Sequence, residues 1–198
     1  MRAGKRALDA TASLAGLVLL SPVLAAIAAA IKLDTPGTVF YRQERVGRAG
    51  VPFRIWKFRT MVAGAASLGG ALTVGDDSRI TEVGRLLRRF KLDELPQLAN
   101  VLTGEMSLVG PRPEVPRYVA LYTEAQRRVL DLVPGITDPA SIAYRDEATL
   151  LAQRPDPETA YVQEIMPDKI RLNLEYAGRA SMRSDLGLIW RTIRHLGR

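Results

Sequence analysis

The sequence contains no cysteine and a single histidine, His195. Without cysteine, disulfides and thiolate metal sites are excluded, and the composition suits a reducing compartment. One histidine excludes a multi-histidine zinc site and argues against a histidine-based triad, so acid–base chemistry falls to carboxyl groups. Aromatic residues make up only 6% of the chain and do not alternate with basic ones. That scarcity weakens the case for an interface that stacks single-stranded nucleic acid.

Basic side chains outnumber acidic ones, 28 to 21, and give the 198-residue chain a formal net charge of +7. A positive excess favours an anionic partner, namely nucleic acid, phospholipid or a phosphorylated substrate. We do not expect nucleic acid as a partner, because the stacking side chains are scarce. Beyond an apolar N-terminal segment, the chain is long enough for one modest domain with a single core.

Residues 10–31 carry no charge and are interrupted by Ser21 and Pro22. The length suits a bilayer, whose hydrocarbon core a helix crosses with about 20 apolar residues. Pro22 removes a backbone donor, so a straight helix would be kinked or broken there. Three interpretations stay open from the run alone: a spanning helix, a re-entrant helix that dips in and returns, and a secretory signal peptide.

Charge on the two flanks favours the re-entrant interpretation. Lys and Arg near membrane segments prefer the cytoplasmic side, and basic residues both precede and follow the run. A spanning helix would leave one basic flank outside, and a secreted remainder this basic would be unusual. We therefore predict a re-entrant helix–turn–helix over residues 1–33, broken at Ser21 and Pro22, and a domain over residues 34–198 on the side of the N-terminus.

The rest of the chain predicts a mainly α fold with a small β-hairpin (α+β). Residues 39–45 and 51–59 have the composition of short strands, joined by a turn over residues 46–50. Along the second strand, apolar residues alternate on one face, which Lys57 and Arg59 continue as cations. Residues 63–75 are rich in Gly and Ala and predict a mobile loop near the hairpin.

Two helices are predicted after that loop. Asp77 and Ser78 are typical N-cap residues for a helix that begins near Arg79. Its apolar positions keep helical spacing, and arginines occupy the remainder. Pro96 suits the first turn of the next helix.

Asp93 and Glu94 lie between these two helices, directly after a strongly cationic stretch. Surrounding cations favour the ionised forms of both carboxyl groups, which keeps them available as a nucleophile or as metal ligands. Neighbouring residues do not share a helix face, so the two can hold different roles. A structural reading competes, because acidic residues before a proline-containing first turn are often only helix caps.

Five cations are candidates for binding phosphate. Arg112 lies between two prolines, which restrict the backbone and suit a fixed guanidinium that captures phosphate in a bidentate manner. Lys57 and Arg59 end a strand, where the alternative is a charged edge that discourages aggregation. Arg85 and Arg88 belong to the cationic helix, where the alternative is a solvated face.

The C-terminal segment predicts a basic amphipathic helix. Its apolar stripe and the basic face opposite it suit the surface of an anionic leaflet, although docking on the protein's own core also stays open. The stripe comprises Met182, Leu186, Ile189, Trp190, Ile193 and Leu196, and the basic residues opposite are Arg183, Arg191, Arg194 and Arg198.

Several segments together resemble a known family. They are residues 5–9 (KRALD), 39–47 (VFYRQERVG), 56–61 (WKFRTM), 79–85 (RITEVGR), 92–98 (LDELPQL) and 106–114 (MSLVGPRPE). Nearly end to end, the chain is similar to bacterial sugar transferases, the monotopic polyprenyl-phosphate phosphoglycosyl transferases that initiate glycan assembly. Its length matches their small, minimal form, which lacks extra N-terminal transmembrane helices.

The resemblance implies a re-entrant helix broken at Ser21 and Pro22 and a catalytic domain on the cytoplasmic face of the bacterial inner membrane. It also implies Mg²⁺ dependence and a catalytic dyad of Asp93 and Glu94, which would also serve as metal ligands. Asp93 would attack the β-phosphate of a UDP-sugar, expel UMP and pass the sugar phosphate to polyprenyl (undecaprenyl) phosphate. Lys57, Arg59, Arg85, Arg88 and Arg112 are the candidates for neutralising phosphate.

The expected partners are therefore a UDP-sugar, polyprenyl phosphate and membrane phospholipid, and a homodimer stays open. The chain departs from the family pattern at residues 138–142 (DPASI), where many members have Gly-Trp and a Gln-Val pair, and at Asn173, where Asp is common. Both departures leave the reaction type in place and put sugar recognition in doubt. The non-enzymatic alternative is a basic membrane-tethered adaptor that binds anionic lipid.

Overall fold

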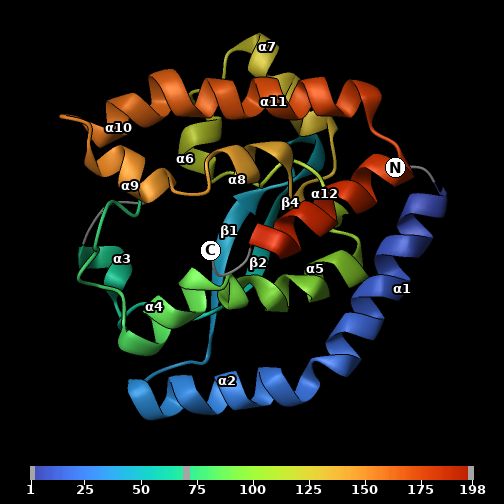
Figure 1. Ribbon diagram of the computed structural model, residues 1–198. Helices are drawn as coiled ribbons and strands as arrows, with labels where there is room; N and C mark the ends of the chain where they lie inside the picture. Colours follow the sequence, from blue (N-terminus) through green and yellow to red (C-terminus); the bar gives the residue numbers. More distant parts are fainter. Residues whose placement is uncertain (1–2, 69–71, 196–198) are drawn as a thin grey trace.

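The computed structural model describes residues 3–68 and 72–195, and the described chain is mostly helical with a small sheet component. Figure 1 shows α1 and α2 along one side, the β1–β2 hairpin in the middle and α11 along the opposite side. The α-helices are α1 Ala3–Leu19, α2 Ser21–Asp34, α3 Ala65–Leu68, α4 Glu82–Arg89, α5 Leu98–Thr103, α6 Pro116–Val119, α7 Glu124–Arg127, α8 Pro139–Ala143, α9 Glu147–Ala152, α10 Pro157–Ala160, α11 Met166–Arg179 and α12 Met182–His195. The strands are β1 Phe40–Val46, β2 Pro52–Phe58, β3 Ser107–Val109 and β4 Gly135–Thr137, and short turns of other helix types are η1 Arg48–Gly50, η2 Leu92–Gln97, η3 Arg128–Asp131 and η4 Tyr161–Ile165.

The N-terminal apolar run forms two helices that break where the sequence predicts. α1 ends at Leu19 and α2 begins at Ser21, with Pro22 in its first turn. Proline cannot donate to the carbonyl four residues before it. The Ser21 hydroxyl instead donates to that carbonyl, Val18 O, at 2.8 Å, so this carbonyl keeps a donor despite the proline.

The two helices are bent by 61° at this break. In the described part of the chain, no single helix has both the length and the apolar character needed to cross a membrane, whereas the bent pair passes that test when its members are taken together. Composition and length alone support this statement, and the re-entrant path stays a prediction.

The predicted hairpin is confirmed. β1 and β2 are antiparallel, with Phe40 opposite Phe58 and Val46 opposite Pro52, so each strand starts one residue later than the sequence pattern indicates. The turn places Ala49 and Gly50 at positive φ, a conformation that glycine adopts without strain. Residues 65–68 of the predicted loop form the short α3, and residues 69–71 lie outside the described residues.

A second strand pair was not predicted. β3 and β4 are parallel and only three residues long, with Ser107 opposite Gly135 and Val109 opposite Thr137. The backbones approach so closely here that a Cβ on Gly110 would lie 2.3 Å from Val133 O. This contact couples the loop after β3, which carries Arg112, to the chain around β4.

Two predicted helix starts are wrong. The cationic helix α4 begins at Glu82, not near Arg79, and its N-cap is Thr81, whose side chain accepts from Gly84 N. Asp77 instead binds Arg79, accepting from its backbone N–H at 3.0 Å and from its guanidinium. Pro96 does not begin an α-helix either, because it lies inside the 3₁₀ turn η2, and α5 follows from Leu98.

Polar side chains join the first half of α1 to the body of the protein. Arg6 donates to the carbonyls of Val101 and Leu102 at the end of α5, at 2.6 and 2.7 Å. Asp9 is fully buried and accepts from the Ser107 hydroxyl at 2.7 Å. Lys5 forms a 2.6 Å ion pair with Asp185 of α12. These contacts hold α1 beside α5, β3 and α12.

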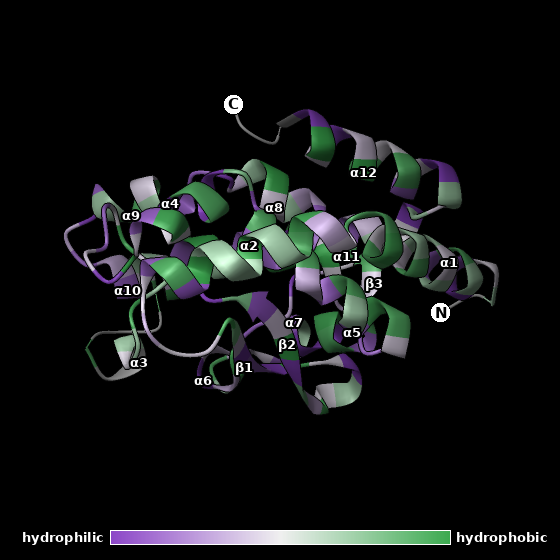
Figure 2. Cartoon of the chain, turned by 90° about the horizontal axis from the view of Figure 1, so that it is seen from below, coloured by the Kyte–Doolittle hydropathy of each residue, from purple (hydrophilic) through white to green (hydrophobic). Residues whose placement is uncertain are grey.

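Apolar side chains remain exposed further along the N-terminal pair and on α12. Around the α1–α2 break they include Leu14, Val18, Leu19 and Val23. On α12 the predicted stripe is exposed at Met182, Leu186, Trp190 and Ile193, half-buried at Ile189, and Leu196 lies outside the described residues. Figure 2 shows hydrophobic residues along both segments. The helix docks on the body through Leu188 and Asp185, which are buried.

Candidate active site

Asp93 and Glu94, the predicted dyad, lie in the 3₁₀ turn η2. This turn begins directly after Lys91, whose backbone is left-handed with φ 55°. Asn100 of α5 fixes this segment against the hairpin. Its side-chain oxygen accepts from Trp56 N at 2.9 Å, and its amide donates to Arg54 O at 3.0 Å. Because side chains two residues apart lie on the same face of a strand, Ile55, which packs against Val101 of α5, and Lys57, which contacts Glu94, share one face of β2.

Glu94 is held by two cations. Lys57 Nζ donates to Glu94 Oε1 at 3.0 Å, and the Arg112 guanidinium donates to both carboxylate oxygens, at 3.0 Å to Oε2 and by a short contact to Oε1. Burial alone would raise the pKa of Glu94, but Arg112 and Lys57 outweigh it and hold the pKa well below its ordinary value. The carboxylate is therefore ionised and fixed in place.

Asp93 is equally buried but differently surrounded. Its exposed fraction is 7%, against 8% for Glu94. Within the described residues, no side chain or backbone group forms a hydrogen bond or ion pair with its carboxyl group. Burial raises the pKa of Asp93 and the charge of Glu94 raises it further, while Lys57 and Arg88 oppose that shift. This carboxyl group thus lies near cations, and none of the described residues engages its oxygens.

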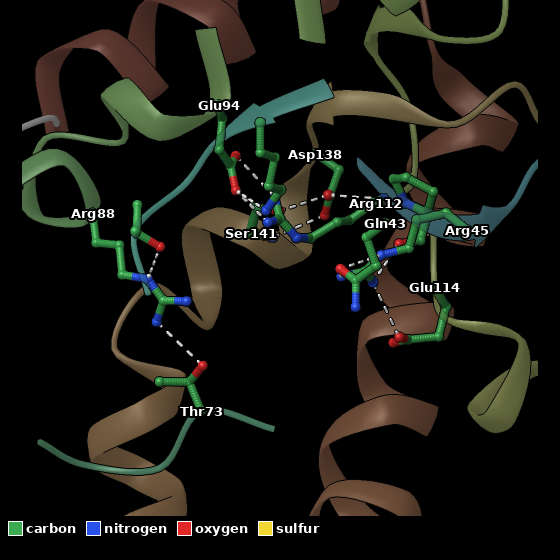
Figure 3. A network of polar contacts seen from close by, with 12 residues as sticks. Gln43, Arg45, Thr73, Arg88, Glu94, Arg112, Glu114, Asp138 and Ser141 are labelled. Atoms are coloured by element: carbon green, nitrogen blue, oxygen red, sulfur yellow. Dashed lines mark hydrogen bonds and ion pairs between the residues drawn. The ribbon is translucent and has the colours of Figure 1, made fainter. Parts of the chain in front are cut away.

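Arg88 approaches the dyad from α4. Its guanidinium donates to the hydroxyls of Thr60, at 3.0 Å, and Thr73, at 3.2 Å (Figure 3). The helix lies close enough for this because Gly84 has no side chain: a Cβ there would lie 2.1 Å from Thr60 O. Two neutral hydroxyls therefore orient Arg88, and its charge is not neutralised by either of them.

Arg112 is positioned by a residue that is distant in the sequence. Its backbone N–H donates to Asp138 Oδ2 at 3.2 Å. Asp138 is fully buried and also accepts from the backbone and the hydroxyl of Ser141, at 2.8 and 2.7 Å, as the N-cap of α8 (Figure 3). The Asp138 charge adds to that of Glu94 in raising the pKa of Arg112 above its ordinary value. The guanidinium consequently stays charged.

The dyad lines a cavity of about 1330 Å³. Its polar lining includes Lys57, Arg88, Lys91, Asp93, Glu94 and Arg112. Burial lowers the pKa of Lys57 to about 8, against the opposing effect of Glu94. The volume suits a small-molecule substrate, and the cations suit phosphate oxygens.

Two of the predicted phosphate ligands lie elsewhere or are already engaged. Arg85 is exposed, does not line the cavity, and is 3.8 Å from Asp76. Arg59 lines the cavity, but its guanidinium donates to the carbonyl of Ile31 in the last turn of α2 and to those of Thr35 and Pro36 directly after it. Arg59 thereby caps the C-terminal end of α2, and a role in phosphate binding stays only a prediction.

Sequence reasoning missed several residues of this site. No sequence pattern pointed to Thr60 or Thr73, the two residues that orient Arg88. Asp138 followed by Pro139 has the pattern of a helix N-cap, which could have located α8 but not the contact with Arg112. Arg145 also lines the cavity, and among the described residues it has no hydrogen-bond or ion-pair partner.

A family model described as "Bacterial sugar transferase" matches residues 1–198. The chain is 38% identical over 197 residues to a UDP-glucose:undecaprenyl-phosphate glucose-1-phosphate transferase of Escherichia coli K12, covering 96% of this chain and 39% of the relative. It therefore spans about two fifths of that protein's length.

Two further relatives extend the comparison. A UDP-glucose:undecaprenyl-phosphate glucose-1-phosphate transferase of Caulobacter vibrioides is 38% identical over 200 residues, which cover 96% of this chain and 68% of the relative. A UDP-N-acetylgalactosamine-undecaprenyl-phosphate N-acetylgalactosaminephosphotransferase of Aeromonas hydrophila is 44% identical over 115 residues, 58% of this chain and 27% of the relative. The named relatives thus differ in the sugar that they transfer and agree in the acceptor.

Proposed function

Because the chain belongs to the bacterial sugar transferase family, we propose that it transfers a sugar-1-phosphate from a UDP-sugar to polyprenyl phosphate and releases UMP. The observation that carries this proposal is the unequal pair of carboxyl groups: within residues 3–68 and 72–195 nothing bonds to the carboxyl group of Asp93, whereas Glu94 is clamped by Lys57 and Arg112. A carboxylate can act as the nucleophile that forms a covalent intermediate, and a carboxyl group that no neighbouring group engages has its oxygens available for attack.

The proposed reaction has two steps at one phosphorus atom. A carboxylate oxygen of Asp93 attacks the β-phosphorus of the UDP-sugar, and the bond to the bridging oxygen breaks, so that UMP leaves with the electron pair. An oxygen of polyprenyl phosphate then attacks the same phosphorus, and the bond to Asp93 breaks. The products are polyprenyl-diphosphate-sugar and the original carboxylate, so the enzyme is regenerated.

The cations around the cavity suit the demands of this reaction. Phosphoryl transfer depends on positioning and on neutralising charge on the phosphate oxygens more than on covalent assistance. Arg88 is held by two hydroxyls and keeps its charge for the substrate. Lys57 and Arg112 hold Glu94, and they lie where the donor's phosphates would meet the dyad.

We propose Mg²⁺ as the metal of this site. The described residues contain no cluster of three or more His, Cys, Asp and Glu side chains suited to a metal. Magnesium is however often bound by one or two carboxylates together with substrate phosphate and water. Asp93 and Glu94 would hold the ion, and it would supply neutralisation of the diphosphate.

We further propose that α1 and α2 form a re-entrant segment, with α12 on the leaflet, so that the cavity faces the cytoplasmic side of the bacterial inner membrane. Exposed apolar side chains around the break and on α12 support this arrangement. The absence of native cysteine permits single-cysteine labelling. Gly4→Cys, at a position with open space around it, and Ala63→Cys, in an exposed loop, should both react only from the cytoplasm; labelling from opposite sides would mean a spanning helix.

The decisive experiment is a panel of UDP-sugars, each mixed with the protein, Mg²⁺ and undecaprenyl phosphate and assayed for UMP. One donor should release UMP, and without lipid it should yield a protein heavier by one sugar phosphate at Asp93 in mass spectrometry. Asp93→Asn should abolish both signals. If no donor released UMP while the chain still bound anionic vesicles, the adaptor alternative would replace this proposal.

A further inference from the structure

The lining of the cavity changes character away from the cations. The cations closest to the dyad, Lys57, Arg88 and Arg112, come from β2, α4 and the loop after β3. Other elements contribute half-buried or exposed apolar side chains to the same cavity. These apolar residues are Leu95 of η2, Leu98 of α5, Leu108 of β3, Ile136 of β4, and Ile189 and Ile193 of α12. A ligand that fills the whole cavity therefore needs a charged part and a long apolar part.

The polar groups within this apolar lining are satisfied by each other. The Thr137 and Thr192 hydroxyls lie 2.6 Å apart, and Thr192 also donates to Leu188 O at 3.0 Å. Since each hydroxyl has a single proton to donate and both protons are used in these two bonds, the threonines join α12 to β4 and offer a ligand no donor. Leu95 follows the dyad within η2, so the apolar lining begins beside Asp93.

The apolar lining also continues to the exposed face of α12. Ile193 lines the cavity and is 54% exposed, and Trp190, its neighbour on the helix, is 61% exposed. The C-terminal half of α12 thus presents apolar side chains both toward the cavity and away from the body. Figure 1 shows this half of α12 in front of the hairpin.

We infer that the cavity between α12, α5 and the β3–β4 pair holds the first isoprene units of the acceptor, with its phosphate at Asp93 and its chain leaving past Ile193. The inference rests on the proposed function, which supplies an acceptor with a charged head and an isoprenoid tail. Burial of that tail removes apolar surface from water on both partners, and the continuity from Asp93 to the outer face of α12 selects a lipid over a soluble apolar ligand.

The two half-reactions separate this inference from the proposed function. Release of UMP from the UDP-sugar alone does not involve the acceptor, whereas turnover does. In detergent, Ile189→Asn and Ile193→Asn should keep a UMP burst equal to that of the original chain. Their KM for a long-chain polyprenyl phosphate should rise about tenfold, the scale set by a changed apolar contact in a binding pocket. With a phosphate ester of one isoprene unit, KM should stay nearly unchanged.

Leu121→Asn is the matched control, because Leu121 is 53% exposed but does not line the cavity; it should keep the original preference for the long chain. Ile193→Leu should restore that preference. The inference is overturned if both asparagine variants keep the original KM for the long-chain acceptor, or if both lose the burst. Absence of a burst in the unaltered chain with every donor would instead refute the proposed function. Ile193 is exposed enough for its variant to fold even where Ile189→Asn does not.

Discussion

The Asp93 side and the Glu94 side of the dyad have nearly equal burial but opposite surroundings. Glu94 is fastened by Lys57 and Arg112, and its pKa is held well below the ordinary value. Asp93 has no hydrogen bond or ion pair within the described residues, and its pKa is raised. Adjacent carboxyl groups of the same type thus acquire different chemistry from their partners. We expect Asp93 to react with the substrate and Glu94 to hold Lys57 and Arg112 in place.

The largest effect should come from removing the unfastened carboxylate. Asp93→Asn keeps the shape of the side chain but cannot form the proposed phosphosugar adduct, so UMP release should fall by about 10³-fold or more, as for other lost nucleophiles. A stopped UMP assay measures this. Because no group in the described part of the chain bonds to the Asp93 carboxyl, thermal unfolding should change little. Wild-type rates in this variant would remove Asp93 from the reaction.

Removing the fastened carboxylate should damage both activity and stability. Glu94→Ala leaves Lys57 and Arg112 buried without their anion, which typically costs about 3–5 kcal/mol of folding free energy. Glu94→Gln keeps an acceptor for Arg112 and should be less destabilised, with kcat reduced by about 10²-fold. Denaturant unfolding compares the two. If Glu94→Ala unfolded at the same denaturant concentration as the original chain, the contacts of Lys57 and Arg112 with Glu94 would not stabilise the fold.

The loop that carries Arg112 offers a gentler change. Asp138→Asn keeps the oxygen that caps α8 but places an amide donor against the Arg112 N–H, so kcat/KM should fall about tenfold, the cost of losing one charge-assisted hydrogen bond that positions another group. Ser141→Ala serves as its control, because it removes one contact of Asp138 and leaves Arg112 N engaged. Equal activity in Asp138→Asn and the original chain would contradict this positioning.

The pH dependence should report Lys57. The pKa of Lys57 is lowered to about 8, so kcat/KM, which reflects the free enzyme, should decline as the pH rises through 8. Lys57→Arg should remove that decline. Folding stability should move the other way: between about pH 8 and the usual lysine value of 10.5, the unfolded chain holds more protons, and the free energy of unfolding rises with pH.

The smallest effect should come from Arg85, which the sequence placed among the phosphate ligands. Its side chain is exposed and lies outside the cavity lining, so Arg85→Gln should alter stability by less than about 0.5 kcal/mol and leave turnover nearly unchanged. The same assay on Arg88→Gln should give a clear loss. Similar losses in both variants would extend the anion site over the outer face of α4.

Local patterns predicted the parts of this fold that local chemistry controls. The hairpin followed from alternation of apolar residues, the break from Ser21 and Pro22, and α12 from its apolar stripe. The start of α4 was missed because Asp77 forms a turn with Arg79, and Thr81 made the better cap. Asp93 and Glu94 stood out through the cationic residues before them.

Contacts between distant segments could not be predicted in the same way. The pairing of β3 with β4 rests on the close approach of Gly110 and Gly135, and neither strand is long enough to show a pattern. The hydrogen bond from the Arg112 N–H to the Asp138 side chain joins residues that are 26 positions apart in the sequence. The binding of Arg59 to the end of α2 likewise depends on tertiary packing, and a cation at the end of a strand looks the same in sequence whether it meets a ligand or a carbonyl.

Gly84 has a consequence for anyone who screens this protein for inactive variants. A methyl group at this position would collide with the backbone at Thr60. Relief of that collision would shift α4 and with it Arg88, which lies one helical turn further along the helix. Such a variant would look like a lesion in the reaction centre although Gly84 meets no substrate. A map of inactivating substitutions would therefore include residues that only set the distance between elements, such as Gly84, together with the residues that take part in the reaction.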